Sequence, residues 1–123
     1  MGGVVEGVGH IILPVKDMES SLAFYQGLLG FAVRGKVNPV WTELEAGGFP
    51  LTLYLDEDSP VIALGPEGAG TPLVFHVSDY PVAEAALTRA GVKCLRESGH
   101  QGVIWDPAGN ALRLHDHRAR SQD

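Results

Sequence analysis

The chain contains little that would tie it to an oxidising compartment or a membrane. It has 123 residues and a single cysteine, Cys94, which excludes an internal disulfide and favours a reducing compartment. No apolar run approaches the roughly 18 residues that a membrane span needs. The first residues also lack the basic and apolar regions of a signal peptide. We therefore expect a cytoplasmic protein with no membrane partner.

Positive charge is scarce as well. Lys and Arg number 9 against 15 Asp and Glu, which gives a net charge of −6. Nucleic-acid binding needs a basic face to meet phosphates, so we expect no nucleic-acid partner. Glycine-rich nucleotide loops and Ser-His-Asp or Cys-His patterns are also missing from the sequence. What is present, 45% apolar residues, predicts an ordinary globular domain.

The second half of the chain repeats the pattern of the first. Residues 9–17 match residues 71–79 at an offset of 62, with Val and Asp recurring at the same places. Residues 48–54 match residues 109–115 at an offset of 61. Two matches at nearly the same offset indicate an internal duplication.

Each half predicts a strand, a helix and then three or so strands. Asp17 and Asp79 are suited to cap the two helices, and Gly30 and Gly91 to end them. We predict one domain, 1–123, with module one at about 8–64, a linker at 65–70 and module two at about 71–116. The expected elements are strands 8–15, 31–36, 40–46, 51–56 and 61–64 with a helix from Met18 to Leu29, then strands 71–77, 92–97, 102–105 and 111–115 with a helix at about 81–90.

Alternation in the first strand of each module predicts which side chains face the helix. Ile11, Leu13 and Val15 are expected on the helix side, as are their counterparts in module two. His10 and its neighbours of the same parity are expected on the opposite face. Two such modules can pair into a curved sheet around a cleft with the helices outside. The predicted fold class is therefore α+β, made of two tandem βαβββ modules.

Three segments of the sequence resemble those of a known protein family. The chain resembles the glyoxalase/bleomycin-resistance/extradiol-dioxygenase superfamily, the vicinal oxygen chelate proteins, over residues 8–116. The resemblance rests on Gly9-His10-Ile11, on the helix phrase 21–31, which ends Leu-Gly-Phe, and on the turn Asp106-Pro107-Ala108-Gly109-Asn110. It implies the vicinal oxygen chelate fold and a homodimer. It does not select one activity, because the superfamily spans lyases, dioxygenases, epimerases, thiol transferases and metal-free drug binders.

The resemblance also implies four positions where metal-using members place His or Glu. Here these positions hold His10, Thr52, Pro72 and Arg113. Proline has no side-chain donor atom and arginine brings a permanent positive charge, so His10 is the one ordinary ligand among them. A catalytic metal usually needs about three protein ligands. We therefore predict no metal cofactor at these positions.

A relocated metal site is the alternative. His76 and His115 share the parity of Pro72 and Arg113. At about 3.3 Å per residue, however, His76 lies roughly 13 Å along the strand from the Pro72 position. That is too far for His76 to share an ion with His10. His115 could also pair with His117 near the chain end, where solvation is the simpler interpretation. Glu43 and Glu45 are oxygen ligands in principle, or solvent-facing charges on a strand.

Two side chains have both a functional and a structural interpretation. Arg113 is either a fork for an anionic ligand group or a partner of Glu43 or Glu45 across the sheet. His10 is either a donor or base toward a ligand, or it satisfies a neighbouring backbone group. Among the aromatic residues, Tyr54 is expected in the cleft, whereas Trp41 and Trp105 are expected to fill the core.

The function predicted from the sequence is binding of a small aromatic or cationic molecule without a metal, as in the bleomycin-resistance branch. A lyase or dioxygenase with a rearranged metal site is the alternative. A metal-free enzyme with His10 as base and Arg113 as anion clamp is a further one. The expected ligand-binding residues are His10, Thr52, Tyr54, His76, Arg113 and His115, with His10 and Arg113 also the candidate catalytic residues.

Overall fold

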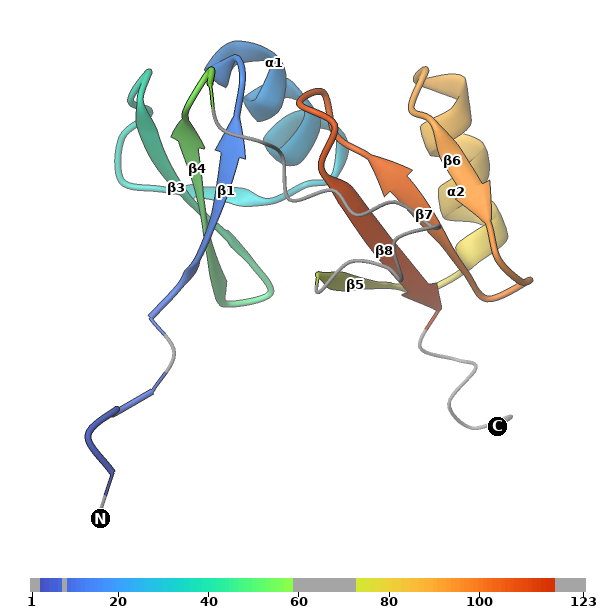
Figure 1. Ribbon diagram of the computed structural model, residues 1–123. Coiled ribbons are helices and arrows are strands. Elements are labelled where there is room, and N and C mark those ends of the chain that lie inside the picture. Colours follow the sequence, from blue (N-terminus) through green and yellow to red (C-terminus); the bar gives the residue numbers. More distant parts are fainter. Residues whose placement is uncertain (1–2, 8, 59–72, 117–123) are drawn as a thin grey trace. The chain divides into compact units, whose positions relative to one another are not determined.

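The computed structural model describes residues 3–7, 9–58 and 73–116. Contacts divide the chain into two compact units, Met1–Glu57 and Asp58–Asp123, each with one four-stranded sheet (Figure 1). The strand expected at 61–64 and the linker expected at 65–70 lie outside the described residues. So do Pro72 and His117. No helix in the described part of the chain is long and apolar enough to cross a membrane.

The first unit is a mixed sheet with the strand order β1-β4-β3-β2. A helix connects the edge strand β1 to β2, and β1 runs parallel to β4 while the other neighbours are antiparallel. In chain order the elements are β1 (Ile11–Val15), α1 (Met18–Leu22), η1 (Ala23–Leu28), β2 (Ala32–Arg34), β3 (Trp41–Ala46) and β4 (Phe49–Leu55).

The helix of this unit begins where the sequence predicts. The Asp17 carboxylate accepts a hydrogen bond from the Ser20 amide at 2.8 Å, which lowers the pKa of Asp17. The helical segment ends at Leu28 with Leu29 as its C-cap, and Gly30 follows with a φ of 85° that favours glycine. Its second half is a π-helix, which the sequence pattern did not predict. There the Leu29 amide donates to the Phe24 carbonyl, five residues back, at 2.9 Å.

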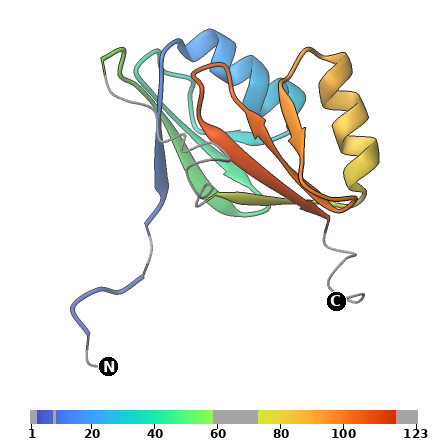
Figure 2. The ribbon, with the colours of Figure 1, turned by 45° about the vertical axis from the view of Figure 1, so that its right-hand side comes forward.

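The second unit has the same plan, with the strand order β5-β8-β7-β6. Its helix contacts β6 and β8 and lies along one side of the sheet (Figure 2). Asp79 caps that helix by accepting from the Val82 amide at 3.2 Å. The elements are β5 (Val74–Val77), α2 (Tyr80–Arg89), β6 (Cys94–Arg96), β7 (Gln101–Trp105) and β8 (Ala111–Asp116).

The strand registers of the two units correspond pair by pair. In the first unit Ile12 lies opposite Thr52, and in the second Val74 lies opposite Arg113. These are the pairs that the sequence repeat aligns. In each unit the two residues lie on a pair of parallel strands, β1 and β4 or β5 and β8. The second strand of that pair also forms an antiparallel hairpin with the strand before it. The α+β fold class with two βαβββ modules is therefore confirmed.

The cores lie where the helices meet the sheets. In the first unit Leu13 and Val15 of β1 are buried on the helix side, as the alternation predicted, and Leu51 and Leu53 of β4 are buried on the same side. The buried apolar side chains of this unit are Leu13, Val15, Met18, Phe24, Tyr25, Leu44, Leu51 and Leu53. Those of the second unit are Leu73, Tyr80, Leu87, Val103, Ile104, Ala111, Leu112 and Leu114.

The Asp-Pro-x-Gly-Asn turn between β7 and β8 is held by one buried carboxylate. Asp106 accepts from the Asn110 amide at 2.7 Å and from the Asn110 side-chain nitrogen at 3.0 Å. Both residues are buried, and Gly109 has a φ of 96°. These bonds fix where β8 begins and therefore the register that positions Arg113.

Asp106→Ala is expected to lower the free energy of unfolding by about 1–3 kcal/mol, because it leaves buried donors of Asn110 without their acceptor. Urea denaturation followed by circular dichroism measures this. Asp106→Asn keeps one acceptor oxygen and should lose less. Equal losses in the two variants would contradict a hydrogen-bonding role for the carboxylate.

Candidate functional site

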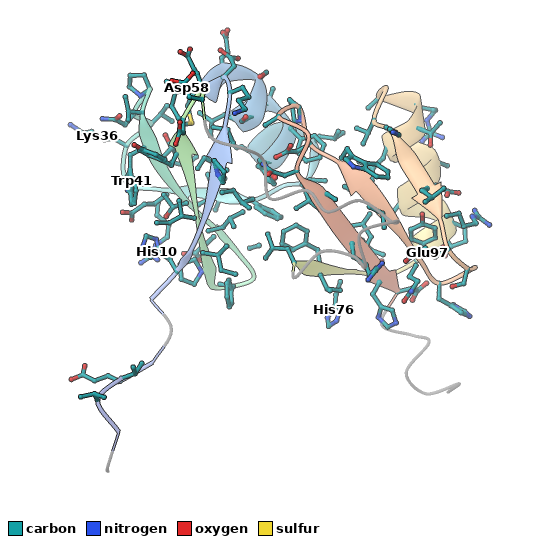
Figure 3. All side chains as sticks on the ribbon, viewed as in Figure 1. His10, Lys36, Trp41, Asp58, His76 and Glu97 are labelled. Carbon is teal, nitrogen blue, oxygen red and sulfur yellow. The ribbon has the colours of Figure 1, made fainter. Side chains whose placement is uncertain are left out.

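Each sheet has one face covered by its helix and one face that carries most of the candidate residues. On the first unit we call this the first open face, defined by His10, Ile12, Trp41, Glu43, Thr52 and Tyr54. The register places the side chains from β1, β3 and β4 on one side of the sheet, and His10, which precedes β1, contacts Thr52 and Trp41 on that side. Figure 3 shows His10 and Trp41 on the side away from α1.

His10 is oriented by a side chain rather than by the backbone. Its Nδ1 lies 2.7 Å from Oγ1 of Thr52, which is only 1% exposed, while the imidazole itself is exposed. If the threonine hydroxyl donates, the other ring nitrogen carries the proton and can donate to a ligand. If instead Nδ1 donates to the threonine oxygen, Nε2 is unprotonated and can accept a hydrogen bond or a proton from a ligand. Both the donor and the base roles predicted for His10 are therefore compatible with this bond.

Trp41 lies at the centre of the first open face. Its ring makes edge contacts with His10 at a centroid distance of 5.8 Å and with Tyr54 at 5.9 Å. Trp41 is 36% exposed and Tyr54 is 38% exposed. The expectation that Trp41 fills the core is wrong. It shares the parity of Glu43, whose carboxylate accepts from the indole nitrogen at 3.2 Å, and not that of the buried Thr42 and Leu44.

A groove of about 390 Å³ continues from Trp41 toward the edge of the sheet. Asn38 shapes it, because its side-chain oxygen accepts from the amides of Val40 and Trp41 at 2.8 and 3.1 Å. Lys36 and Trp41, both labelled in Figure 3, line this groove together. The groove is lined by Arg34, Lys36, Val37, Asn38, Trp41 and Glu43. Sequence reasoning missed this groove, since the segment between the two strands shows no motif.

The second unit has its own open face, which we call the second open face and define by His76, Glu97, Gln101, Arg113 and His115. Arg113 lies here, and its fork is already occupied. Its Nε and Nη2 donate to the two Glu97 oxygens at 3.0 and 2.8 Å. A bidentate pair of this kind holds the guanidinium in one orientation.

The prediction that Arg113 pairs with Glu43 or Glu45 is therefore wrong. Glu43 accepts from Trp41, and Glu45 pairs with Arg34 at 3.4 Å. The true partner, Glu97, follows β6 and lies 16 residues from Arg113 in the sequence. Arg113 is thus a paired side chain whose use as an anion clamp requires Glu97 to give way.

His76 and His115 are brought together on this face. They lie directly opposite each other on the parallel strands β5 and β8, with their ring centroids 6.0 Å apart. Gln101 lies opposite His115 on the other side, and its side-chain nitrogen donates to Glu97 at 3.2 Å. The six ligand-binding residues predicted from the sequence thus form one group of three on each unit.

Comparison with known proteins gives the family. Residues 7–114 match the Glyoxalase/Bleomycin resistance protein/Dioxygenase superfamily. The chain belongs to this superfamily, as the sequence resemblance indicated.

Two curated relatives differ in activity. One is glutathione transferase FosA of Serratia marcescens, 26% identical, with 91% of this chain and 82% of that protein covered. Another is the catechol-2,3-dioxygenase of Bacillus subtilis (strain 168), 30% identical with 93% of this chain covered. The alignment spans only 42% of that dioxygenase.

Solved structures agree on the fold. The fosfomycin resistance protein FosX of Listeria monocytogenes matches with a TM-score of 0.73 at 16% identity, covering 98% of this chain and 100% of that one. TnmS3, an antibiotic binding protein from Streptomyces sp. CB03234, matches with a TM-score of 0.65 at 25% identity, covering 93% and 98%.

Of the four positions that the superfamily resemblance assigns to metal ligands, the structure describes three, and at two of these the side chain present does not suit a metal ion. The Thr52 hydroxyl is engaged by His10, and the Arg113 cation is paired with Glu97. Only His10 supplies an ordinary donor among the three positions that the structure describes. Within residues 3–7, 9–58 and 73–116, no group of three or more His, Cys, Asp and Glu could hold a metal ion.

Cys94 is not among the residues that define either open face, and its thiol is not activated. Burial raises the pKa of its thiol, and the nearby Glu84 carboxylate acts in the same direction, while the Thr88 hydroxyl partly opposes them. Because a raised pKa reduces the thiolate fraction, alkylation by iodoacetamide at pH 7.5 should be slower than for a cysteine-containing peptide. Mass spectrometry of the time course measures this. A rate equal to the peptide's would contradict it.

Proposed function

We propose that the protein binds a planar small molecule on the first open face without using a metal. The observation that carries the proposal is the exposed aromatic group formed by Trp41, Tyr54 and His10, with the buried Thr52 hydroxyl holding the imidazole in place. Stacking on Trp41 and Tyr54 would supply the apolar contact, and His10 would supply a directional hydrogen bond.

Among the residues that define the first open face, the Glu43 carboxylate favours an aromatic ligand that carries a cationic or donor group. Glu43 places a carboxylate at the edge of the Trp41 ring. A ring face beside a carboxylate attracts cations by both the ring quadrupole and the charge. The overall charge of −6 acts in the same direction. Sequestration of such a compound is what TnmS3 suggests, since that relative is described as an antibiotic binding protein.

Metal independence is supported by the donor chemistry of the described residues. In this proposal the ligand contacts His10 directly, with no metal ion between them. We include in the proposal a homodimer in the cytoplasm, as the family resemblance and the sequence composition suggest. The other ligand-binding residues predicted from the sequence, His76, Arg113 and His115, are less suited to this ligand, because Glu97 occupies the Arg113 fork.

The test uses the untagged protein in EDTA with a panel of planar compounds matched in size, in cationic, neutral and anionic forms. Tryptophan fluorescence reports binding near Trp41, and the melting temperature reports stabilisation. We expect one-to-one binding that EDTA does not weaken and that is tightest for the cationic members. Binding that appears only after a divalent metal is added, and that His10→Ala abolishes, would overturn the proposal in favour of a metal-dependent enzyme. Turnover of a bound compound without metal, seen by NMR, would favour catalysis with His10 as the base.

A further inference from the structure

We propose that His76 and His115 on the second open face form a binding site for a divalent transition metal ion. Neither histidine is among the residues that define the first open face or among the family's four metal positions. The metal site therefore stands or falls independently of the proposed ligand binding.

The strand register creates the site. His76 and His115 are direct partners on parallel strands, so their side chains emerge side by side on one face of the sheet. Their ring centroids are 6.0 Å apart. With metal–nitrogen bonds of about 2.0–2.1 Å, two imidazoles on one ion have centroids about 5–6 Å apart. The separation of the two rings therefore lies at the upper end of the range that a shared ion requires.

The backbone around the two histidines is held by hydrogen bonds between strands. β8 is hydrogen-bonded on both sides, by β5 and by β7. The Arg113 amide donates to the Leu73 carbonyl at 3.0 Å, which fixes the start of the β5–β8 pairing. Since the two histidines come from neighbouring strands, a bound metal ion would cross-link β5 and β8. Binding would therefore raise the free energy of unfolding of this unit.

Among the described residues of the second open face, the charges permit a cation. Arg113 lies on the same face, two residues from His115, and its charge would oppose a metal ion. Glu97 neutralises it through two hydrogen bonds. Gln101, opposite His115, has its amide nitrogen turned to Glu97, so its carbonyl oxygen is a candidate acceptor for a water on the ion.

Ligand type sets the class of metal. Imidazole nitrogens favour Cu²⁺, Ni²⁺ and Zn²⁺, whereas Mg²⁺ and Ca²⁺ require oxygen ligands. Two protein ligands leave the remaining coordination positions to water or to an added ligand. The affinity should therefore be weaker than that of a structural zinc site with four protein ligands.

The experiment is calorimetric titration of NiCl₂ and ZnCl₂ into the full-length, untagged, EDTA-stripped protein. We expect one ion per chain, a rise in melting temperature on binding, and no heat of binding with MgCl₂. His76→Ala and His115→Ala should each weaken binding at least tenfold. His100→Ala is the matched control, since it removes an exposed histidine that lies outside the pair, and it should leave the affinity unchanged.

Circular dichroism of each variant shows that it is folded. Three outcomes would overturn the proposal: no stoichiometric binding of either ion, binding that survives both single replacements, or binding that His10→Ala abolishes while the pair is intact. The last outcome would place the metal on the first unit and would also contradict metal-independent function. The first two would leave the ligand proposal intact, so the two failures can be told apart.

Discussion

Gly102→Ala is expected to lower the free energy of unfolding by about 3 kcal/mol or more. A Cβ at this position would overlap the Tyr80 hydroxyl and would lie 2.8 Å from Cζ of the same ring and 2.7 Å from the Leu95 carbonyl oxygen. Real Cβ atoms do not approach other heavy atoms this closely, so either the ring or the strand must move. Equilibrium urea denaturation measures the loss.

Neither neighbour can move cheaply. Tyr80 is fully buried, and its hydroxyl donates to Glu84 at 3.1 Å. Burial, together with the Glu84 carboxylate, raises the pKa of the Tyr80 phenol, so it stays a donor across the ordinary pH range. The Tyr80 amide in turn donates to the buried Asp116 carboxylate at 2.9 Å. Displacing the ring would therefore strain the start of α2 and the end of β8 together.

Two companion variants make the prediction specific. Gly99→Ala introduces the same methyl group where nothing lies within 4 Å, and it should cost little. In a Tyr80→Leu background the ring contacts are gone, so Gly102→Ala should cost less there than in the wild type. Equal costs in the two backgrounds, or a large cost for Gly99→Ala, would contradict steric exclusion by Tyr80.

Much of the fold was predictable because local chemistry specifies it. Asp17 and Asp79 cap helices, and Gly30 follows the end of one in a conformation that other residues avoid. Period-two alternation then assigns each side chain of β1 to one face. The π-helix was not predictable, because five-residue hydrogen bonding leaves no separate mark on the apolar pattern of that helix.

The site was predicted less well, for two different reasons. Trp41 could have been placed correctly, since Trp41, Glu43 and Glu45 alternate with buried residues and a tryptophan among carboxylates indicates a solvent-facing side. The partner of Arg113 could not. Glu97 reaches it only through the registers of β6, β7 and β8, and these depend on two turns whose exact lengths the sequence does not specify.

The two open faces have diverged from equivalent positions. Tyr54 in the first unit corresponds by register to His115 in the second, and Thr52 corresponds to Arg113. One face therefore gained aromatic surface and the other gained imidazoles and an ion pair. This division explains why we assign an organic ligand to the first face and a metal to the second, since each set of side chains suits one chemistry and not the other.

Trp41→Ala is expected to weaken binding of the planar ligand at least tenfold, which corresponds to about 1.4 kcal/mol. The ring supplies the stacking surface between His10 and Tyr54, and its removal also frees Glu43 from the indole nitrogen. Calorimetric titration with the tightest compound of the panel gives the Kd without relying on tryptophan fluorescence.

Phe49→Ala is the matched control for this variant. Phe49 is an aromatic residue of the same unit, 48% exposed, and its parity on β4 places it on the face opposite Trp41. It should leave the Kd unchanged. Trp41→Phe keeps an aromatic ring and should fall between the wild type and Trp41→Ala. If Trp41→Ala remains folded and binds within twofold of the wild type, the ligand does not stack on the first open face, and the aromatic group has to be explained as a contact surface for another protein chain.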